Sequence, residues 1–179
     1  METVSTQDFV QAMGLHVSSV CVITTAVGDE RFGLTATAVS SVCANPPRLL
    51  VCVNTSGMTH AKITEASVLC VNVVADGQDH VAKAFAGMMG KEFDRFSVGN
   101  WTKLKTGSPV LQDATAVFDC QIVQSIPQHS HSIFICEVVA TQTKSSAEPL
   151  LYGNRKFRTL RQIMSLQNVN VDVDDTLHF

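Results

Sequence analysis

The sequence predicts a mainly β protein whose antiparallel strands form a barrel with a few peripheral α-helices. Short runs of β-branched and apolar residues recur along the chain, and most are bounded by Pro, Gly, Asn or Asp. The helical segments between them follow no regular βαβ alternation, which argues against a doubly wound parallel sheet. Barrel closure would remove exposed strand edges. An open sandwich is the alternative, because periodicity does not show whether the first and last strands meet.

Length and composition predict one domain spanning residues 1–179, with 45% hydrophobic residues for its core. The formal net charge is -3 and no basic run occurs, so neither nucleic acid nor an anionic membrane is an expected partner. The N-terminus lacks the pattern of a signal peptide, and the apolar runs are too short to span a bilayer. We therefore expect a soluble, cytoplasmic protein.

The secondary-structure elements follow from local patterns. Ser5-Thr6-Gln7-Asp8 resembles a capping box, and Phe9, Ala12 and Met13 recur at helical spacing, which predicts a helix within residues 1–15. Strands are expected at 20–25, 33–38, 49–54, 68–74, 116–123 and 133–139. Gly28-Asp29 predicts a hairpin turn after the first of them.

Three further helices are expected. One covers residues 59–66, and one follows Asp76, pairs Val81 with Phe85 and ends at Gly87 as its C-cap. A third covers residues 158–166, and residues 168–179 are expected to form an extended tail.

The cysteines and histidines do not predict a disulfide framework or a metal site. No C-x-x-C pair occurs, and we interpret the six cysteines as buried thiols in a reducing compartment: Cys21, Cys43, Cys52, Cys70, Cys120 and Cys136. His129 and His131 would face the same way on a strand, but no third ligand is evident, so no metal is predicted.

A binding surface is indicated by a stretch rich in hydroxyl groups, residues 35–41. The chain contains no G-x-G-x-x-G, Walker, H-E-x-x-H or G-x-S-x-G motif, so a dinucleotide held in the Rossmann manner is unsupported. Small side chains allow a flat ligand to approach the backbone, and Thr59 with His60 would open a helix whose amides favour phosphate. This pattern suits a planar ligand that carries phosphate. Alternatively, the Thr and Ser residues are only strand formers and caps.

An ordered set of motifs from about Phe9 to Leu160 resembles the flavin reductase-like family. The set comprises residues 33–42 (GLTATAVSSV), 45–47 (NPP), 50–54 (LVCVN), 59–60 (TH), 71–73 (VNV), 85–87 (FAG), Trp101, 109–111 (PVL), Cys120, 131–135 (HSIFI), 137–138 (EV), 150–152 (LLY) and Arg155. Two positions depart from the family pattern: Val17-Ser18-Ser19 replaces the usual Pro-Thr-Gly, and Cys136 stands where glycine is common.

The resemblance implies a split β-barrel of Greek-key type and a homodimer with flavin sites near the subunit interface. It also implies NAD(P)H:flavin oxidoreductase activity, and a separate monooxygenase acting on aromatic compounds would receive the reduced flavin. The flavin is FAD or FMN, with FAD slightly preferred. NADH is favoured over NADPH, because no Arg/Lys cluster suits a 2′-phosphate.

The family's functional residues map onto this sequence by position. His131 corresponds to the residue beside the nicotinamide, and a strand cap is its alternative role. The residues implied for flavin binding are Thr35, Ala36, Thr37, Ser40, Ser41, Cys52, Val53, Asn54, Ser56, Thr59, His60, Phe85, Ala86, Gly87, Tyr152 and Arg155. Phe85 could equally be core, and Arg155 a solvated surface charge.

The reaction implied by the resemblance requires geometry more than reactive side chains. Hydride transfer from nicotinamide to flavin uses no protein nucleophile, so the lack of a catalytic triad is consistent with it. Backbone amides of residues 52–54 are candidates for stabilising the negative charge that develops on the flavin. Two alternatives stay open: a flavin carrier without reductase activity, and an oxidase like the pyridoxamine-phosphate branch of split barrels, whose extra basic residues are not found.

Overall fold

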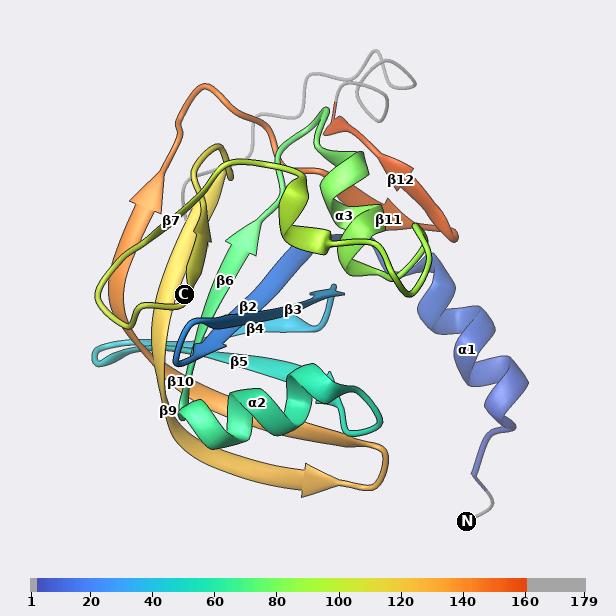
Figure 1. Ribbon diagram of the computed structural model, residues 1–179. Coiled ribbons are helices and arrows are strands. Elements are labelled where there is room, and N and C mark those ends of the chain that lie inside the picture. The colour runs from blue at the N-terminus through green and yellow to red at the C-terminus, as the bar shows by residue number, and fades with distance from the viewer. Residues whose placement is uncertain (1–2, 161–179) are drawn as a thin grey trace.

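The computed structural model describes residues 3–160, which form a mainly β structure with three α-helices and one short 3₁₀-helix (Figure 1). The helices are α1 (Thr6–Leu15), α2 (Met58–Ala66), α3 (Asp79–Phe85) and η1 (Arg95–Ser97). The strands are β1 (Ser18–Ser19), β2 (Cys21–Val27), β3 (Glu30–Ala36), β4 (Val39–Ala44), β5 (Pro47–Asn54), β6 (Val68–Val73), β7 (Trp101–Lys103), β8 (Pro109–Leu111), β9 (Ala116–Gln128), β10 (His131–Thr143), β11 (Leu151–Gly153) and β12 (Lys156–Arg158). The predicted mainly β class is confirmed.

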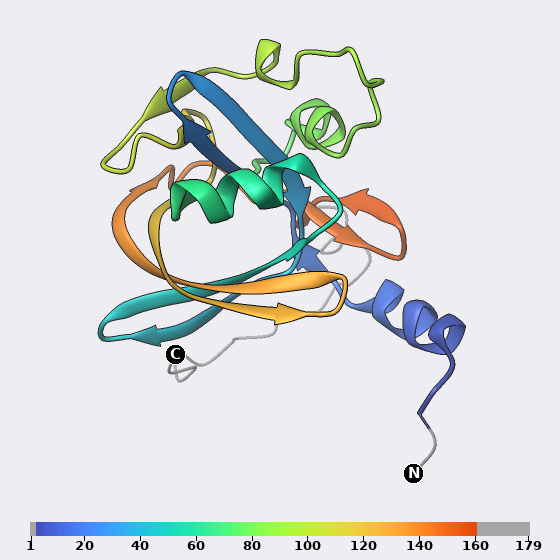
Figure 2. The ribbon, with the colours of Figure 1, turned by 60° about the horizontal axis from the view of Figure 1, so that its bottom comes forward.

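Seven strands form one antiparallel sheet in the order β3-β2-β6-β9-β10-β5-β4. Its two edges are β3 and β4, and within residues 3–160 no strand ladder joins them, so the closed barrel that we predicted is not found. The sheet is nevertheless strongly curved, because β10 changes register with β9 twice, between Ile135 and Cys136 and between Val138 and Ala140. Figure 2 shows the long β9–β10 hairpin bending around α2.

The strand boundaries differ from the sequence prediction where polar residues extend a strand. β9 and β10 each have 13 residues, whereas the prediction gave 116–123 and 133–139. The second half of β9 is mostly exposed and contains several polar residues, so its sequence lacks the hydrophobic pattern of a strand. It nevertheless pairs with β10. β3 ends at Ala36 and not at the predicted Ala38, and β4 was not predicted. Thr37 and Ala38 therefore lie between two strands.

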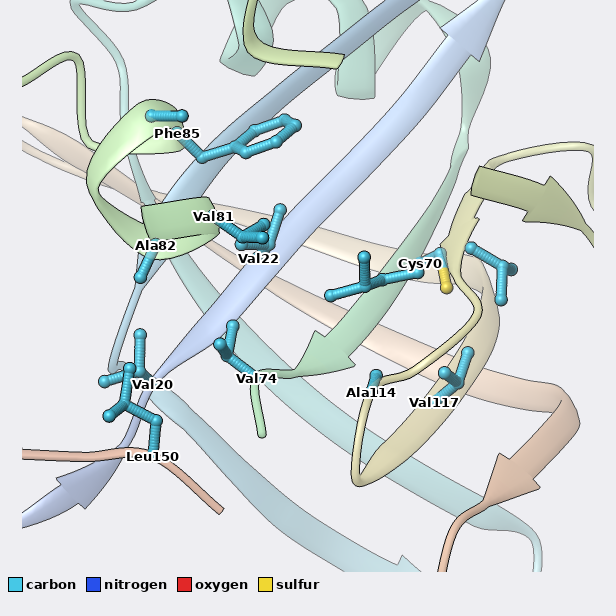
Figure 3. Packing of buried hydrophobic residues seen from close by; sticks show 13 residues of the cluster. Val20, Val22, Cys70, Val74, Val81, Ala82, Phe85, Ala114, Val117 and Leu150 are labelled. Carbon is cyan, nitrogen blue, oxygen red and sulfur yellow. The ribbon is translucent and has the colours of Figure 1, made fainter. Parts of the chain in front are cut away.

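Two hydrophobic clusters occupy opposite faces of the sheet. Along β2, Val22 belongs to the cluster covered by α3, whereas Ile23 belongs to the cluster covered by α2 through Ile63. Figure 3 shows the first cluster, in which Phe85 of α3 lies over the sheet. A side chain at Gly33 would collide with the Phe85 ring, since an added Cβ would lie 2.6 Å from it. Glycine at position 33 thus lets α3 approach β3 closely.

The two ends of the described chain differ in how they are held. Ser5 caps α1 as predicted, and its hydroxyl accepts a hydrogen bond from the Asp8 amide at 3.1 Å. No residue of α1 is buried, and the helix projects from the body of the molecule (Figure 2). At the other end, Arg158 closes β12 and does not begin the predicted helix 158–166. The rest of that helix beyond residue 160, and the predicted tail 168–179, lie outside the described residues.

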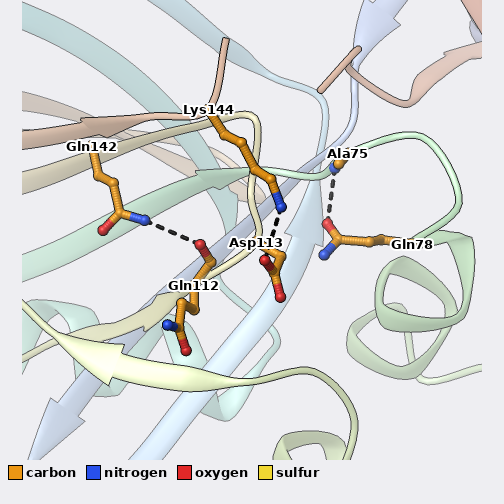
Figure 4. Close-up of polar contacts among 6 residues, drawn as sticks. All are labelled: Ala75, Gln78, Gln112, Asp113, Gln142 and Lys144. Carbon is orange, nitrogen blue, oxygen red and sulfur yellow. Dashed lines mark hydrogen bonds and ion pairs between the residues drawn. The ribbon is translucent and has the colours of Figure 1, made fainter. Parts of the chain in front are cut away.

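Polar side chains tie the end of β10 to the connection between β8 and β9 (Figure 4). Lys144 pairs with Asp113 at 3.0 Å, and the Gln142 amide donates to the Gln112 carbonyl at 3.1 Å. The Lys144 ammonium keeps the pKa of the Asp113 carboxyl below its usual range by hydrogen bonding and by charge. These exposed contacts contribute little stability and serve mainly to orient the connection.

Candidate functional site

A cleft of about 370 Å³ lies where β3, β5, β10, the end of α3 and the β11–β12 hairpin meet. Eight of the predicted site residues line it: Thr35, Ala36, Thr37, Cys52, Asn54, Ala86, His131 and Tyr152. These residues extend over more than 100 positions of the chain, from Thr35 to Tyr152, so the fold assembles the cleft from distant segments. Its size is within the usual range for a small-molecule site.

The first wall of the cleft is the end of β3 and the link to β4. The Thr35 hydroxyl donates to the Ala82 carbonyl of α3 at 2.7 Å, which joins this wall to the helix. Thr37 and Ala38 are exposed and lie between the strands. The Cys52 amide donates to the Ala38 carbonyl at 3.0 Å, so of the three amides expected to stabilise charge on a ligand, that of Cys52 is not free.

Asn54 and His131 form the second wall because they are directly paired at the end of the β5–β10 ladder. Both are exposed. The His131 Nδ1 atom pairs with the Ser130 hydroxyl at 2.9 Å, which leaves Nε2 as the ring atom for a ligand. The next residue, Ser132, points to the opposite face of the sheet and is buried. His129 occupies a left-handed turn at φ 47°, and it does not line this cleft with His131.

The third wall includes residues that the sequence did not predict. Tyr152 and Phe157 are cross-strand partners whose rings meet edge to face, with centroids 5.6 Å apart. The lining residues that were not predicted are Val20, Ala38, Met88 and Phe157. Gly153-Asn154 is a turn signal between two short runs, and it could have indicated a hairpin that brings Phe157 close to Tyr152.

Two predicted residues line neighbouring grooves. Ser40 borders grooves of about 480 Å³ and 420 Å³, and Ser41 borders the larger of these. Both grooves share Thr37 with the 370 Å³ cleft. The three hollows are therefore contiguous along β4 and β5.

The residues expected to bind phosphate, Ser56, Thr59 and His60, do not line the cleft. Thr59 is buried on the core side of α2, and its hydroxyl donates to the Gly33 carbonyl at 3.2 Å. The His60 Nε2 atom pairs with the Ser132 hydroxyl at 2.8 Å, and its ring lies beside Phe134. Ser56 is exposed, and its amide donates to the Asn54 side chain at 2.8 Å. Ser56 is thereby hydrogen-bonded to Asn54, which does line the cleft.

Four other predicted residues lie in different settings. Val53 is 1% exposed in the core, and Phe85 is 2% exposed against Phe96 and Trp101. Gly87 has a φ of +77° after α3, as expected of a residue that ends a helix. Arg155 is exposed at the tip of the β11–β12 hairpin, with a φ of +57°.

The cleft is nearly neutral. Among the lining residues that belong to the described part of the chain, His131 is the one side chain of the Asp, Glu, Lys, Arg and His types. Within residues 3–160, no cluster of three or more His, Cys, Asp or Glu could hold a metal ion. Uncharged hydroxyl, amide and phenol groups beside apolar surface suit a planar, largely uncharged ring system. The residues present therefore fit a flavin ring in the cleft.

The cysteines are not all buried, which corrects the sequence prediction. Cys43 is exposed on β4 and Cys52 is half-buried in the cleft. Burial raises the pKa of the Cys21 thiol to about 12 and that of Cys136 to about 12. Burial likewise raises the pKa of Cys70 and Cys120 above the usual thiol range. Burial therefore favours the protonated form of these four thiols.

Similarity to known proteins shows the family to which this chain belongs. Residues 13–161 match the flavin reductase like domain. This chain belongs to the flavin reductase-like family. It is 41% identical over 152 residues to FMN reductase (NADH) RutF 1 of Methylorubrum extorquens, covering 85% of this chain and 75% of the relative.

Solved structures of flavin reductases share the fold of this family member. NADH:FAD oxidoreductase SgcE6 of Streptomyces globisporus C-1027, in complex with NAD and FAD fragments, is 30% identical with a TM-score of 0.79, covering 88% of this chain and 96% of that one. BorF, the flavin reductase component of a bacterial two-component tryptophan halogenase, is 27% identical with a TM-score of 0.79, covering 87% and 98%. Among residues 3–160 of this chain, no helix is long and apolar enough to cross a membrane.

Proposed function

We propose that the 370 Å³ cleft binds a flavin and that the protein reduces it with NADH. Membership of the family and about 40% identity to a curated NADH-dependent FMN reductase make the chain an NADH-dependent flavin reductase. The observation that supports this cleft as the site is the meeting of the Thr35–Thr37 segment, His131 and Tyr152 around one neutral hollow.

The side chains of the cleft would act by binding and orientation. The Thr37 hydroxyl and the Asn54 amide are exposed donors for the polar edge of the ring. The Tyr152 and Phe157 rings exclude water from one side. His131, through Nε2, would hydrogen-bond the nicotinamide amide or the diphosphate of the nucleotide and so hold the nicotinamide ring against the flavin. When bound, the flavin supplies the hydride acceptor.

The flavin identity is proposed from the relatives. The relative at 41% identity is named for FMN, whereas the structure solved with FAD fragments is 30% identical. The higher identity favours FMN as the better substrate, in place of the slight preference for FAD that we first expected. NADH is favoured because, within residues 3–160, the lining of the cleft contains no Arg or Lys for a 2′-phosphate.

Reduced flavin would be passed to a separate oxygenase component that acts on an aromatic compound. The support is BorF, which serves a two-component halogenase of tryptophan, an aromatic substrate. An open cleft, bordered by exposed residues such as Thr37 and His131, suits a flavin that is released after each turnover. We also propose a homodimer with a split-barrel fold, because among the strands of residues 3–160 the outer edge of β4 has no partner and Val42 is exposed there, which a second copy could cover.

Anaerobic reduction tests the proposal directly. Purified protein is mixed with NADH or NADPH and with FMN or FAD, and the loss of flavin absorbance in the visible range is followed. We expect rapid bleaching with NADH, with a higher kcat/KM for FMN than for FAD. Flavin binding without bleaching would instead support a carrier, and absence of both would refute the proposal. Light scattering of the same samples measures the oligomeric state.

A further inference from the structure

Met88 is placed at the cleft by the C-terminal cap of α3. The Gly87 amide donates to the Ala84 carbonyl at 3.1 Å, and the Met88 amide donates to the Lys83 carbonyl at 3.0 Å. Together with the positive φ of Gly87, these bonds form a Schellman motif. The motif gives the backbone of Met88 a defined position immediately beyond the helix.

The side chain of Met88 is not buried against its own helix. In a Schellman motif the residue at this position commonly makes an apolar contact with the last turn of the helix. Met88 is instead 66% exposed, and it lines the cleft together with Tyr152 and Phe157. A large apolar side chain is therefore held in solvent at the border of a binding cleft, where a ligand would cover it.

The chain is attached to the body of the molecule both before and after the segment that follows Met88. Arg95 donates to the Gly33 carbonyl at 3.0 Å and so connects the segment after Met88 to the β3 strand. The Phe96 ring packs edge to face on Phe85 of α3, with centroids 4.9 Å apart. The backbone is thus anchored on both sides, while the unbranched thioether can adapt to the surface of a ligand.

We propose that Met88 packs on the ring of the bound flavin and slows its release, as a binding residue of the cleft. The inference rests on the function proposed above. A thioether contacts aromatic rings favourably, and it adapts to a flat surface better than a branched side chain does. Met88 would then set the residence time of the flavin in an otherwise open cleft, and so the balance between reduction and delivery to an oxygenase.

The test compares Met88→Ala and Met88→Leu with Met89→Ala. Met89 is the matched control, because it is the next residue, is 51% exposed and does not line the cleft. The dissociation constant and the dissociation rate of FMN and of FAD are measured by flavin fluorescence and stopped flow. KM for NADH is measured at saturating flavin, and thermal unfolding is measured without flavin.

We expect Met88→Ala to raise the flavin dissociation constant about 5-fold, through faster dissociation, as the loss of one sulfur–aromatic contact implies. Met88→Leu should change it less than about 2-fold, because it keeps most of the apolar area. Met89→Ala should match the wild type, and none of the variants should alter unfolding. Wild-type affinity in Met88→Ala, or an equal loss in Met89→Ala, overturns this inference alone. A wild-type protein that binds neither flavin would refute the proposed function and this inference with it.

Discussion

Two polar regions of the molecule use the same residue types in opposite ways. In the first region, Asn72 of β6 is fully buried. Its side-chain NH₂ group donates to the Val22 carbonyl at 3.0 Å, and its side-chain oxygen accepts from the Leu111 amide at 2.7 Å. At the cleft, Asn54 is exposed, and its oxygen accepts one bond, from the Ser56 amide. Hydrogen-bonding capacity satisfied inside the protein stabilises the fold, whereas capacity left at the surface is available to a ligand.

The buried polar region fixes the β7–β8 segment against the large sheet. Asp119 is fully buried, and one of its oxygens accepts from the Thr106 amide at 2.8 Å. The Thr24 hydroxyl donates to the carbonyl of Pro109, which precedes the Val110 and Leu111 residues of the core. These groups have protein partners, which offset part of the cost of burying them. The buried region and the cleft therefore differ in whether their polar groups have protein partners, and not in residue type.

The largest expected effect is the loss of stability in Asn72→Ala. The change leaves the Leu111 amide and the Val22 carbonyl without their side-chain partner and opens a small cavity, so we expect a loss of about 3 kcal/mol in the free energy of unfolding. Urea denaturation measures it. Asn54→Ala is the matched control, with a loss below about 1 kcal/mol but weaker flavin binding. Equal losses of stability in the two variants would remove the distinction between the regions.

His131→Ala should change nucleotide use and leave flavin affinity nearly intact. Losing one hydrogen bond from His131 Nε2 to the nucleotide should raise KM for NADH about 10-fold, equivalent to roughly 1.4 kcal/mol. Steady-state kinetics at saturating flavin, together with a flavin titration, separate the two ligands. A proportional loss of both affinities, or no change, would show that His131 does not contact the nucleotide.

The sequence predicted those parts of the fold and the site that depend on local pattern. β2, β5 and β6 follow from β-branched runs and turn residues, and the capping box at Ser5 defined α1. The closed barrel that we predicted is not found. Whether the two edge strands of a sheet hydrogen-bond to each other is a non-local property, which a local sequence pattern does not show. β4 was missed because its serines had been interpreted as part of a binding surface, and because a mostly exposed edge strand shows no alternation of buried and exposed residues.

The candidate site shows the same division. A motif identifies residue types but not the face on which each side chain lies, so Thr59 and His60 were expected at the ligand although Gly33 and Ser132 are their partners. Met88 and Phe157 were missed for the opposite reason. They carry no polar chemistry, and the end of α3 and the β11–β12 hairpin bring them to the cleft.

The variant Arg155→Gly tests whether Arg155 contacts a cofactor or is only a surface residue in a strained backbone conformation. Arg155 has a φ of +57°, a conformation that costs a residue with a side chain about 1 kcal/mol and costs glycine almost nothing. We expect the variant to gain up to about 1 kcal/mol in the free energy of unfolding, reduced by the greater freedom of glycine in the unfolded chain. If Arg155 contacts a cofactor phosphate, KM for NADH or flavin should rise in the same variant. A more stable variant with unchanged kinetics would show that Arg155 is a surface charge.

The smallest effect is expected at the ion pair between Asp79 and Lys83, which lies on the surface at the start of α3 and belongs to neither polar region. The hydrogen bond from Lys83 keeps the pKa of the Asp79 carboxyl below its usual value. Because the pKa is lower in the folded state than in the unfolded state, the pair stabilises the fold above about pH 4. That contribution is lost as the pH falls through the folded-state pKa.

Solvent screening limits this contribution to about 0.5 kcal/mol. Urea denaturation of the wild type and of Asp79→Asn at pH 7 and at pH 3 should show a difference of this size at pH 7, and a smaller one at pH 3. A loss near that of Asn72→Ala would mean that exposure does not weaken a polar contact here, against the contrast between the two regions.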